Sequence, residues 1–243
     1  MTDDGGAPRV AFFRPDDRRA ERAVEAARER GLEPLSDPLL ETVPTGASPR
    51  TDASFVVLTS VTGVGLAADE VRGTDSVVCA IGPKTAEALR NAGVEVNVVP
   101  DEYTSAGLVE ALRERVEGER VEVARSDHGS DELLDGLNDA GAYVHETVLY
   151  EIRRPAGGGE ETARALKDGG VDAVLFTSSL TVEHLVDALE ETGVGRKALD
   201  EVGVYAIGDP TRETAESLGV RVDSVPENET FDSLLKSVES ERA

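Results

Sequence analysis

The chain has 243 residues, of which 49 are acidic and 25 are basic, and its net charge is -24. A surface this negative repels duplex DNA, RNA and anionic membranes, so we expect no nucleic acid and no membrane among its partners. The acidic residues are spread along the whole chain, as in folded proteins of a salt-rich cytoplasm, where the Debye length falls to roughly 3 Å. We therefore expect a halophilic source.

Cysteine and apolar content narrow the class of protein further. Cys79 is the only cysteine, so one chain can build neither a disulfide framework nor a thiolate metal cage, and we expect no metal. No apolar run approaches the roughly 18 residues that span a bilayer, and the N-terminal MTDDGGAPR is unlike a secretory signal. We expect a cytoplasmic protein, and the length favours two domains over one large core.

Short apolar runs bounded by turn residues predict strands, and segments with helical periodicity alternate with them. The predicted strands, in chain order, are 9–14, 54–60, 76–82, 94–100, 120–125, 142–152, 172–178, 203–208 and 220–226. The predicted helices are 17–31, 86–93, 104–116, 130–141, 179–193 and 230–238. This alternation indicates an α/β fold, with parallel sheets covered by helices on both faces.

The chain also repeats itself. IGPKTAEALRNAG (81–93) matches IGDPTRETAESLG (207–219), and GLEPLSDPLLE (31–41) matches GAYVHETVLYE (141–151). FVVLTS likewise matches AVLFTS, and RVAFFR matches RVEVAR. The sequence therefore predicts an internal duplication, with copies from residue 9 to about 117 and from 120 to 243, each large enough to form a domain.

Each copy carries a Gly-x-x-Thr turn between a strand and a helix, at Gly82 to Thr85 and at Gly208 to Thr211. The first N–H groups of a helix point outwards, and a small residue lets an anion approach them. Thr85 and Thr211 can present a hydroxyl to a ligand or simply cap the helix. Asp209 lies in the second turn, where an anion would bind, so the first turn is the better candidate.

Polar side chains also lie where predicted strands end. Thr59 and Ser60 end one strand, and Ser178 and Ser179 follow another. Ligands of open α/β sheets bind at the carboxyl ends of the strands, although serines there can also be ordinary N-caps. Arg14 ends the first strand, where it could meet a carboxylate or remain a solvated surface residue.

Other motifs carry little weight. GVGLAA (63–68) fits the G-x-G-x-x-A dinucleotide fingerprint, but its glycines come after the strand end and no acid sits where a ribose partner is expected. The chain has no phosphate-loop motif, nucleophile elbow or H-E-x-x-H metal pair. Its three histidines are far apart in the sequence, so we expect them to be structural: His128, His145 and His184.

Tyr150 follows an apolar alternating run and lies in a segment that we expect to cross from one domain to the other, near a cleft. A phenol in such a place could donate a proton or a hydrogen bond. The alternative is a half-buried linker aromatic without a chemical role.

Taken together, these residues resemble the uroporphyrinogen-III synthase family from about residue 9 to 238. The resemblance rests on Arg14-Pro15, on the strand ends around Ser60 and Ser178, on both Ile-Gly-x-x-Thr turns, on GERVEVARSDHGSDELLDGLNDAGAYVHE and on Val148-Leu149-Tyr150. The family turn is Gly-Pro-x-Thr. The first copy keeps it, whereas the second has Gly208-Asp209-Pro210-Thr211, which weakens the expectation that it binds substrate.

The resemblance implies two flavodoxin-like or Rossmann-like parallel-sheet domains joined by a two-stranded linker. One domain would comprise residues 1–38 and 152–243 and the other 42–148, with linkers at 39–41 and 149–151. We expect the protein to act as a monomer.

The implied reaction converts hydroxymethylbilane, a linear tetrapyrrole with eight carboxylates, into uroporphyrinogen III by loss of water, inversion of ring D and ring closure. No cofactor is implied, and a transient contact with the enzyme that supplies the bilane is allowed. Tyr150 would be the catalytic residue that assists departure of the hydroxyl. Backbone N–H groups would hold the substrate together with Thr85, Gly82, Ser60, Thr59, Ser178, Ser179, Thr211 and Arg14.

Two other functions stay open on the sequence alone. A non-enzymatic two-domain binding or regulatory protein could keep the same scaffold, because fold does not fix function. A nucleotide-binding α/β enzyme would depend on the weak GVGLAA match.

Overall fold

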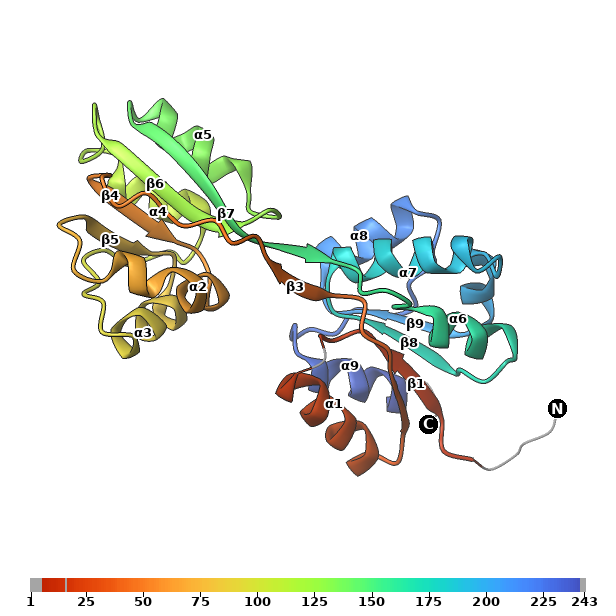
Figure 1. Ribbon diagram of the computed structural model, residues 1–243. Helices are drawn as coiled ribbons and strands as arrows, with labels where there is room; N and C mark the ends of the chain where they lie inside the picture. The colour runs from red at the N-terminus through yellow and green to blue at the C-terminus, as the bar shows by residue number, and fades with distance from the viewer. Residues whose placement is uncertain (1–5, 16, 241–243) are drawn as a thin grey trace. The chain divides into compact units, whose positions relative to one another are not determined.

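The computed structural model describes residues 6–15 and 17–240. Its contacts divide the chain into two compact units (Figure 1). Unit 1 comprises the chain up to Glu41 and from Arg153 onwards, and unit 2 comprises Thr42–Ile152. Unit 2 is therefore one continuous stretch of sequence, whereas unit 1 is assembled from two stretches.

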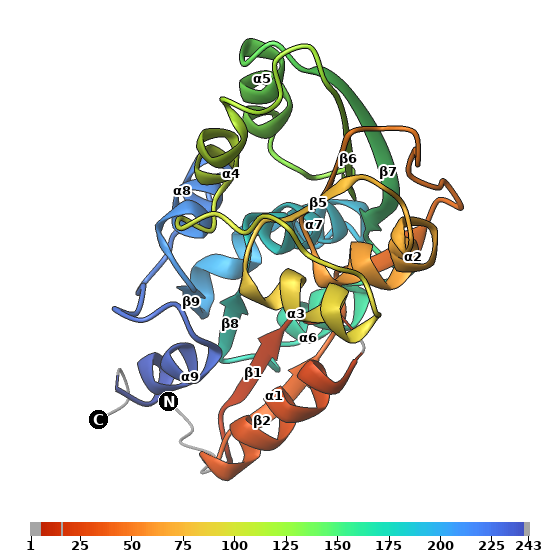
Figure 2. The same cartoon turned by 90° about the vertical axis from the view of Figure 1, so that its left-hand side faces the viewer.

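Unit 1 is a four-stranded parallel sheet between two layers of helices. Its strands are β1 (Arg9–Phe12), β2 (Glu33–Ser36), β8 (Ala173–Phe176) and β9 (Gly203–Ala206), in the order β2-β1-β8-β9. The helices α1 (Arg18–Glu29) and α9 (Phe231–Ser240) cover one face (Figure 2). The other face packs against α6 (Glu160–Lys167), α7 (Ser179–Glu191), the 3-10 helix η1 (Arg196–Glu201) and α8 (Asp209–Ser217).

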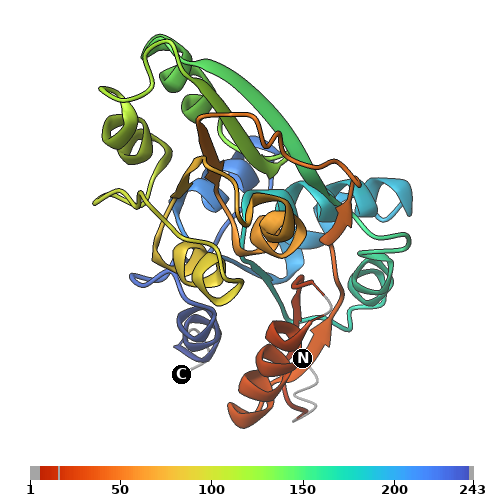
Figure 3. The same ribbon diagram turned by 60° about the vertical axis from the view of Figure 1, so that its left-hand side comes forward.

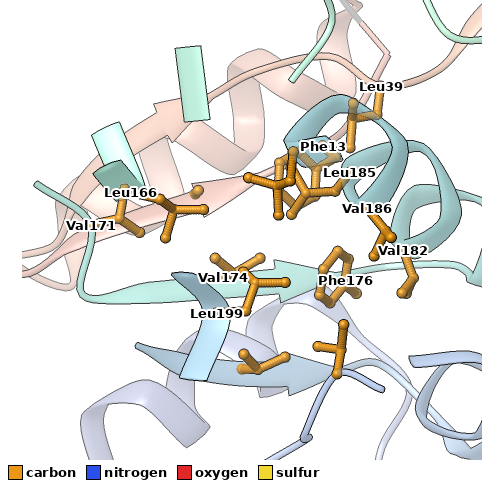
Figure 4. Packing of buried hydrophobic residues seen from close by; sticks show 14 of the residues in the cluster. Phe13, Leu39, Leu166, Val171, Val174, Phe176, Val182, Leu185, Val186 and Leu199 are labelled. Carbon is orange, nitrogen blue, oxygen red and sulfur yellow. The ribbon is translucent and has the colours of Figure 1, made fainter. Parts of the chain in front are cut away.

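The core of unit 1 shows why these strands form. Apart from Arg9 at the start of β1, both β1 and β8 consist of apolar residues buried on both faces, as the central strands of a parallel sheet must be. Phe13 and Phe176 stack with ring centroids 5.5 Å apart, among the leucines and valines of α6 and α7 (Figure 4). On the opposite face Phe12 meets Phe231 edge-on at 5.1 Å.

Unit 2 has a five-stranded sheet in the order β3-β7-β6-β4-β5. Its strands are β3 (Glu41–Pro44), β4 (Phe55–Leu58), β5 (Val77–Ala80), β6 (Arg120–Ser126) and β7 (Tyr143–Arg153), and those from β7 to β5 are parallel. The helices α2 (Val61–Val71) and α3 (Pro83–Asn91) cover one face, and α4 (Ser105–Leu112) and α5 (Asp131–Asp139) cover the other. The strand β7 is long and continuous (green in Figure 3).

Each unit combines elements from both copies of the repeat. In unit 1, β1 from the first copy pairs with β8 from the second. In unit 2, β4 from the first copy pairs with β6 from the second. The orders β2-β1-β8-β9 and β7-β6-β4-β5 correspond strand by strand. The predicted α/β fold with two similar parallel sheets is confirmed.

Two predicted strands are wrong in extent, and two helices and the strands β2 and β3 lie outside the predicted ranges. Residues 94–100 and 220–226 contribute only single bridges, Cys79 to Val98 and Tyr205 to Ser224. Beside each bridge a side chain, of Asn97 or of Asp223, accepts an N–H of the edge strand in place of a further backbone carbonyl. The missed helices are α2 and α6. Since GVGLAA lies inside α2 and not at a strand-to-helix turn, it lacks the geometry of a dinucleotide site.

A buried glutamate pairs with a histidine of the neighbouring strand in unit 2. Glu122 of β6 has no exposed surface, and its Oε2 lies 2.7 Å from Nδ1 of His145 on β7. Its Oε1 has no hydrogen-bond partner among the residues that the structure describes. The pairing agrees with a structural role for His145, because a buried carboxylate needs a partner.

We expect His145→Leu to lower the free energy of unfolding by about 1–3 kcal/mol, since it removes a hydrogen-bond partner of the buried Glu122 side chain. The double variant Glu122→Leu/His145→Leu should recover most of this loss, because it removes the buried charge as well. Denaturant unfolding at constant high salt measures both. Equal stability of His145→Leu and the unmodified protein would contradict this account.

Candidate functional site

The predicted site residues gather at the carboxyl ends of the strands in both units. In unit 2, Thr59 and Ser60 directly follow β4, and Gly82 follows β5. In unit 1, Ser178 follows β8 and Gly208 follows β9. These are the sheet edges at which open α/β folds bind their ligands.

Ser60 and Tyr150 are far apart in sequence and in contact in unit 2. Ser60 is the N-cap of α2, and its Oγ accepts the N–H of Gly63 at 2.9 Å. The hydroxyl of Tyr150 on β7 donates to the same Oγ at 3.0 Å. Because β6 lies between β4 and β7 in the sheet, this bond spans two strand spacings at the sheet edge.

The ring of Tyr150 is part of the core of unit 2. Only 6% of the residue is exposed, and it packs in the apolar cluster with Leu58, Val64 and Leu149. Tyr150 is thus more deeply buried than the half-buried linker aromatic considered as an alternative, and its hydroxyl is directed to Ser60. Thr59 is partly exposed beside this pair.

Asp127 belongs to the same edge and was not singled out in the sequence. Its Oδ1 accepts the N–H of Ile152 at 3.0 Å, and its own N–H donates to the carbonyl of Tyr150 at 3.2 Å. Partial burial raises the pKa of Asp127, but hydrogen bonds from His128 and from Ile152 outweigh it, so the pKa lies below its ordinary value. The only sequence signal was an acid just after a predicted strand.

The first Gly-x-x-Thr turn opens α3 without a side-chain cap. Gly82 is the N-cap, Pro83 follows it, and the first helical hydrogen bond runs from Ala86 to the Gly82 carbonyl. The N–H groups of Lys84 and Thr85 therefore precede the helical ladder. The idea that Thr85 caps the helix is wrong: it lies three residues inside, with only 4% of its surface exposed.

The second turn has the same backbone and a different charge. Gly208 is the N-cap of α8, and Thr211 lies three residues inside it, again 4% exposed, so it does not cap the helix either. A Cβ on Gly208 would lie 2.5 Å from Oε1 of Glu229, so a carboxylate of the chain lies against this turn. At the matching place in unit 2, Gly82 faces Tyr103.

The acid of the second turn shares one arginine with a second acid of the same helix. Asp209 accepts hydrogen bonds from Nε and Nη2 of Arg212, at 3.1 and 3.0 Å, and Arg212 also reaches Glu216. These contacts raise the pKa of Arg212, and the hydrogen bond to Asp209 is the main cause. The guanidinium of Arg212 therefore pairs with acids of its own helix.

The two serines of unit 1 differ in their contacts. Ser178 is the N-cap of α7 and accepts the N–H of Thr181 at 3.4 Å. Ser179 donates to the carbonyl of Pro210 at 3.2 Å and accepts from the hydroxyl of Thr214 at 2.8 Å. Ser179 thus ties the start of α7 to α8.

Arg14 and Arg125 occupy matching places in the repeat and behave differently. Arg125 is buried and bonds Glu146 at 2.5 Å and the carbonyl of Ser130 at 2.6 Å. The guanidinium of Arg14 lies over the ring of Phe231, 4.6 Å from its centroid, and its buried Nε has no partner among the described residues. Burial lowers the pKa of Arg14. Arg14 is therefore the arginine of the pair that keeps a free donor.

Several findings bear on other kinds of site. Within residues 6–15 and 17–240, no group of three or more His, Cys, Asp or Glu side chains could hold a metal ion. No helix in that part of the chain is long and apolar enough to cross a membrane. A cavity of about 640 Å³ lies along α4 and α5, and none of the predicted site residues lines it.

The fold and the site define the class of the protein: two parallel-sheet α/β units related by duplication, with hydroxyl and N–H donors at the carboxyl ends of their strands. Residues 21–236 match the sequence model of the family described as uroporphyrinogen-III synthase HemD. The chain belongs to the uroporphyrinogen-III synthase family, which is a family of enzymes.

Individual relatives agree with this assignment. The uroporphyrinogen-III synthase of Synechococcus elongatus is 31% identical over 77% of this chain and 75% of the relative. A protein of Archaeoglobus fulgidus is 29% identical over 96% of this chain and 99% of its own. A protein of Methanothermobacter thermautotrophicus is 39% identical, but that match spans 60% of this chain and 59% of the relative.

Solved structures show the same fold. A mutant uroporphyrinogen III synthase of Thermus thermophilus matches 96% of this chain and 98% of its own with a TM-score of 0.65, at 23% identity. The enzyme of Helicobacter pylori matches 97% of this chain and 100% of its own with a TM-score of 0.63, at 15% identity.

We expect Asp127→Ala to lower the free energy of unfolding at pH 7 by about 0.5–1.5 kcal/mol, because it removes an acceptor of the Ile152 N–H. The folded-state pKa is depressed, so this stabilisation is present above the unfolded pKa of about 3.9 and is lost as the pH falls through the folded value. Urea unfolding at pH 7 and at pH 3 measures the difference.

Asp127→Asn is the matched control, because its amide oxygen can still accept the bond from Ile152. It should lie between the unmodified protein and Asp127→Ala at pH 7. A gap between Asp127 and Asp127→Ala that is the same at both pH values would contradict the charge-dependent part of this explanation.

Proposed function

We propose that the protein is a uroporphyrinogen-III synthase, a carbon–oxygen lyase that dehydrates hydroxymethylbilane, inverts ring D and closes the macrocycle to uroporphyrinogen III. The observation that carries the proposal is that residues 21–236 match the family while both sheets place hydroxyl and N–H donors at their carboxyl edges. The proposed reaction requires no cofactor.

The chemistry sets two tasks for the protein. The hydroxyl leaves more readily when its oxygen receives a proton, and the azafulvene that remains is a strong electrophile. It must then react at the substituted carbon of ring D, through a spiro intermediate, because attack at the free carbon gives the uninverted isomer. The bilane also closes unaided to that isomer, so holding it in one shape is a large part of the catalysis.

Neutral donors suit a polyanionic substrate in a protein of charge -24. The N–H groups at the start of α3 and the hydroxyls of Thr59, Ser60 and Thr85 would hold carboxylates without opposing them. In unit 1, Arg14, Ser178 and Ser179 would contribute. Salt would screen the acidic surface on a scale of roughly 3 Å at molar concentration.

The two turns should contribute unequally. Thr211 belongs to the proposed binding set by its place in the repeat, but Asp209 opens its helix and Glu229 lies against Gly208. Two carboxylates at this turn oppose a third by charge repulsion. Thr85 should therefore bind substrate more strongly than Thr211.

Turnover of hydroxymethylbilane in high salt, with the product separated by isomer, tests the proposed function. We expect uroporphyrinogen III at a rate above spontaneous closure. Only the type I isomer, formed at the spontaneous rate, would reject the synthase and favour a non-enzymatic binding protein on the same scaffold.

Thr85→Val should raise KM about three- to tenfold, the loss expected for one hydrogen bond to a ligand. Thr211→Val, its counterpart in the repeat, should raise KM less than twofold because its turn is already negative. Steady-state kinetics with hydroxymethylbilane separate the two. A larger effect at Thr211 would reverse the proposed ranking.

A further inference from the structure

The hydroxyl of Ser60 can act towards a further group only as a hydrogen-bond donor. A serine hydroxyl has two acceptor lone pairs and one donor hydrogen. Its oxygen already accepts from the Gly63 N–H at 2.9 Å and from the Tyr150 hydroxyl at 3.0 Å. Both lone pairs are occupied, and within residues 6–15 and 17–240 the hydrogen of Ser60 has no acceptor, so it can be donated to a ligand.

The free hydrogen lies at the ligand-binding edge of the sheet. Ser60 directly follows β4 and is only partly buried, whereas Tyr150 is 6% exposed. Of the two residues, Ser60 is the more exposed to solvent and to a substrate. The ring of Tyr150 lies in the apolar core of unit 2.

The arrangement is confined to one unit. Ser178 is the counterpart of Ser60 in the repeat and also caps a helix, with its Oγ 3.4 Å from the N–H of Thr181. The segment 31–41 corresponds to 141–151, which places Leu40 where the second copy has Tyr150. A leucine cannot donate to Ser178, so the paired hydroxyls belong to unit 2.

We propose that Ser60 is the catalytic residue that donates the proton to the departing hydroxyl of the substrate, and that Tyr150 acts through Ser60. The proposal rests on the proposed synthase function. It assigns the Ser60 hydrogen to the departing hydroxyl instead of to a substrate carboxylate, and it places Tyr150 next in the proton path.

The protons and electrons of the step balance. The substrate C–O bond breaks with its electron pair on oxygen, which takes the Ser60 hydrogen and leaves as water. Ser60 regains a proton from Tyr150, which becomes a phenolate beside the positive N-terminal end of α2. When ring D attacks and later loses its proton, that proton returns along the same path, so both residues end as they began.

Four variants test the division of roles. Ser60→Ala should lower kcat about 10²-fold with little change in KM, as the loss of a general acid does. Tyr150→Phe should lower kcat about tenfold, because Ser60 can still donate. The double variant should be no worse than Ser60→Ala, and Ser60→Thr should keep kcat within a few fold of the unmodified enzyme, because it retains both the cap and the hydroxyl.

Thr104→Ala is the matched control for the lost helix cap. Thr104 caps α4 and accepts the N–H of Gly107 at 3.0 Å, the same bond that Ser60 makes to Gly63. This variant should shift the denaturant midpoint much as Ser60→Ala does, while kcat stays within twofold. An equal fall in kcat in both variants would mean that lost stability, and not proton donation, causes the effect.

Two further readouts separate the inference from the function on which it rests. Single-turnover rates in mixtures of H2O and D2O should show two protons in motion for the unmodified enzyme and one for Tyr150→Phe. The hydroxyl proton of Tyr150 should give a protected NMR signal that Ser60→Ala abolishes, whether or not the protein turns over the bilane.

Opposite results would overturn the inference. Unchanged kcat in Ser60→Ala beside a large loss in Tyr150→Phe would make Tyr150 the direct donor, and multiplying effects in the double variant would make the two hydroxyls independent. Absence of the type III isomer with the unmodified protein would reject the synthase function itself.

Discussion

The pairing of β1 with β8, and of β4 with β6, is the constraint on which the rest of the structure depends. Each pair joins a strand of one sequence copy to a strand of the other, so neither copy can complete a sheet from its own residues. The chain must leave unit 1 after Glu41 and return to it at Arg153. The strands β3 and β7, which lie side by side, carry it out and back. Tyr150 is paired with Ser126, the last residue of β6, after a register shift between Arg125 and Ser126, and from this position its hydroxyl reaches Ser60.

The duplicated halves have kept their backbone and diverged in chemistry. Both turns start a helix at an uncapped glycine, yet the first faces Tyr103 and the second faces Glu229. Likewise, Arg125 bonds Glu146, whereas the Nε of Arg14, whose guanidinium lies over Phe231, has no partner in the part of the chain that the structure describes. A repeat preserves what packing needs, such as the glycine at a close approach. Side chains that point outwards from it are free to change, and in this protein they place the carboxylates of Asp209 and Glu229 at the second turn.

The sequence predicted the sheets well because their central strands are continuous apolar runs, which parallel strands require. It missed α2 because that helix contains two glycines and is apolar on most sides, so its periodicity is weak. It placed Ser60 and Tyr150 in the site separately but could not join them, since their contact depends on the register of β7 against β6. The sequence did not point to Asp127, because this residue bonds backbone groups of β7 and such bonds leave no pattern of side-chain types.

Because each sheet pairs strands from both sequence copies, the two units become complete at different times during synthesis. During synthesis, β1, α1 and β2 leave the ribosome first, yet their sheet partner β8 begins only at Ala173. At about 5–20 residues per second, this leaves the first β-α-β segment without its neighbour for roughly ten seconds. Unit 2 needs nothing beyond Ile152 and can close earlier, although it begins later in the chain. The inserted unit therefore matures before the unit that encloses it in sequence.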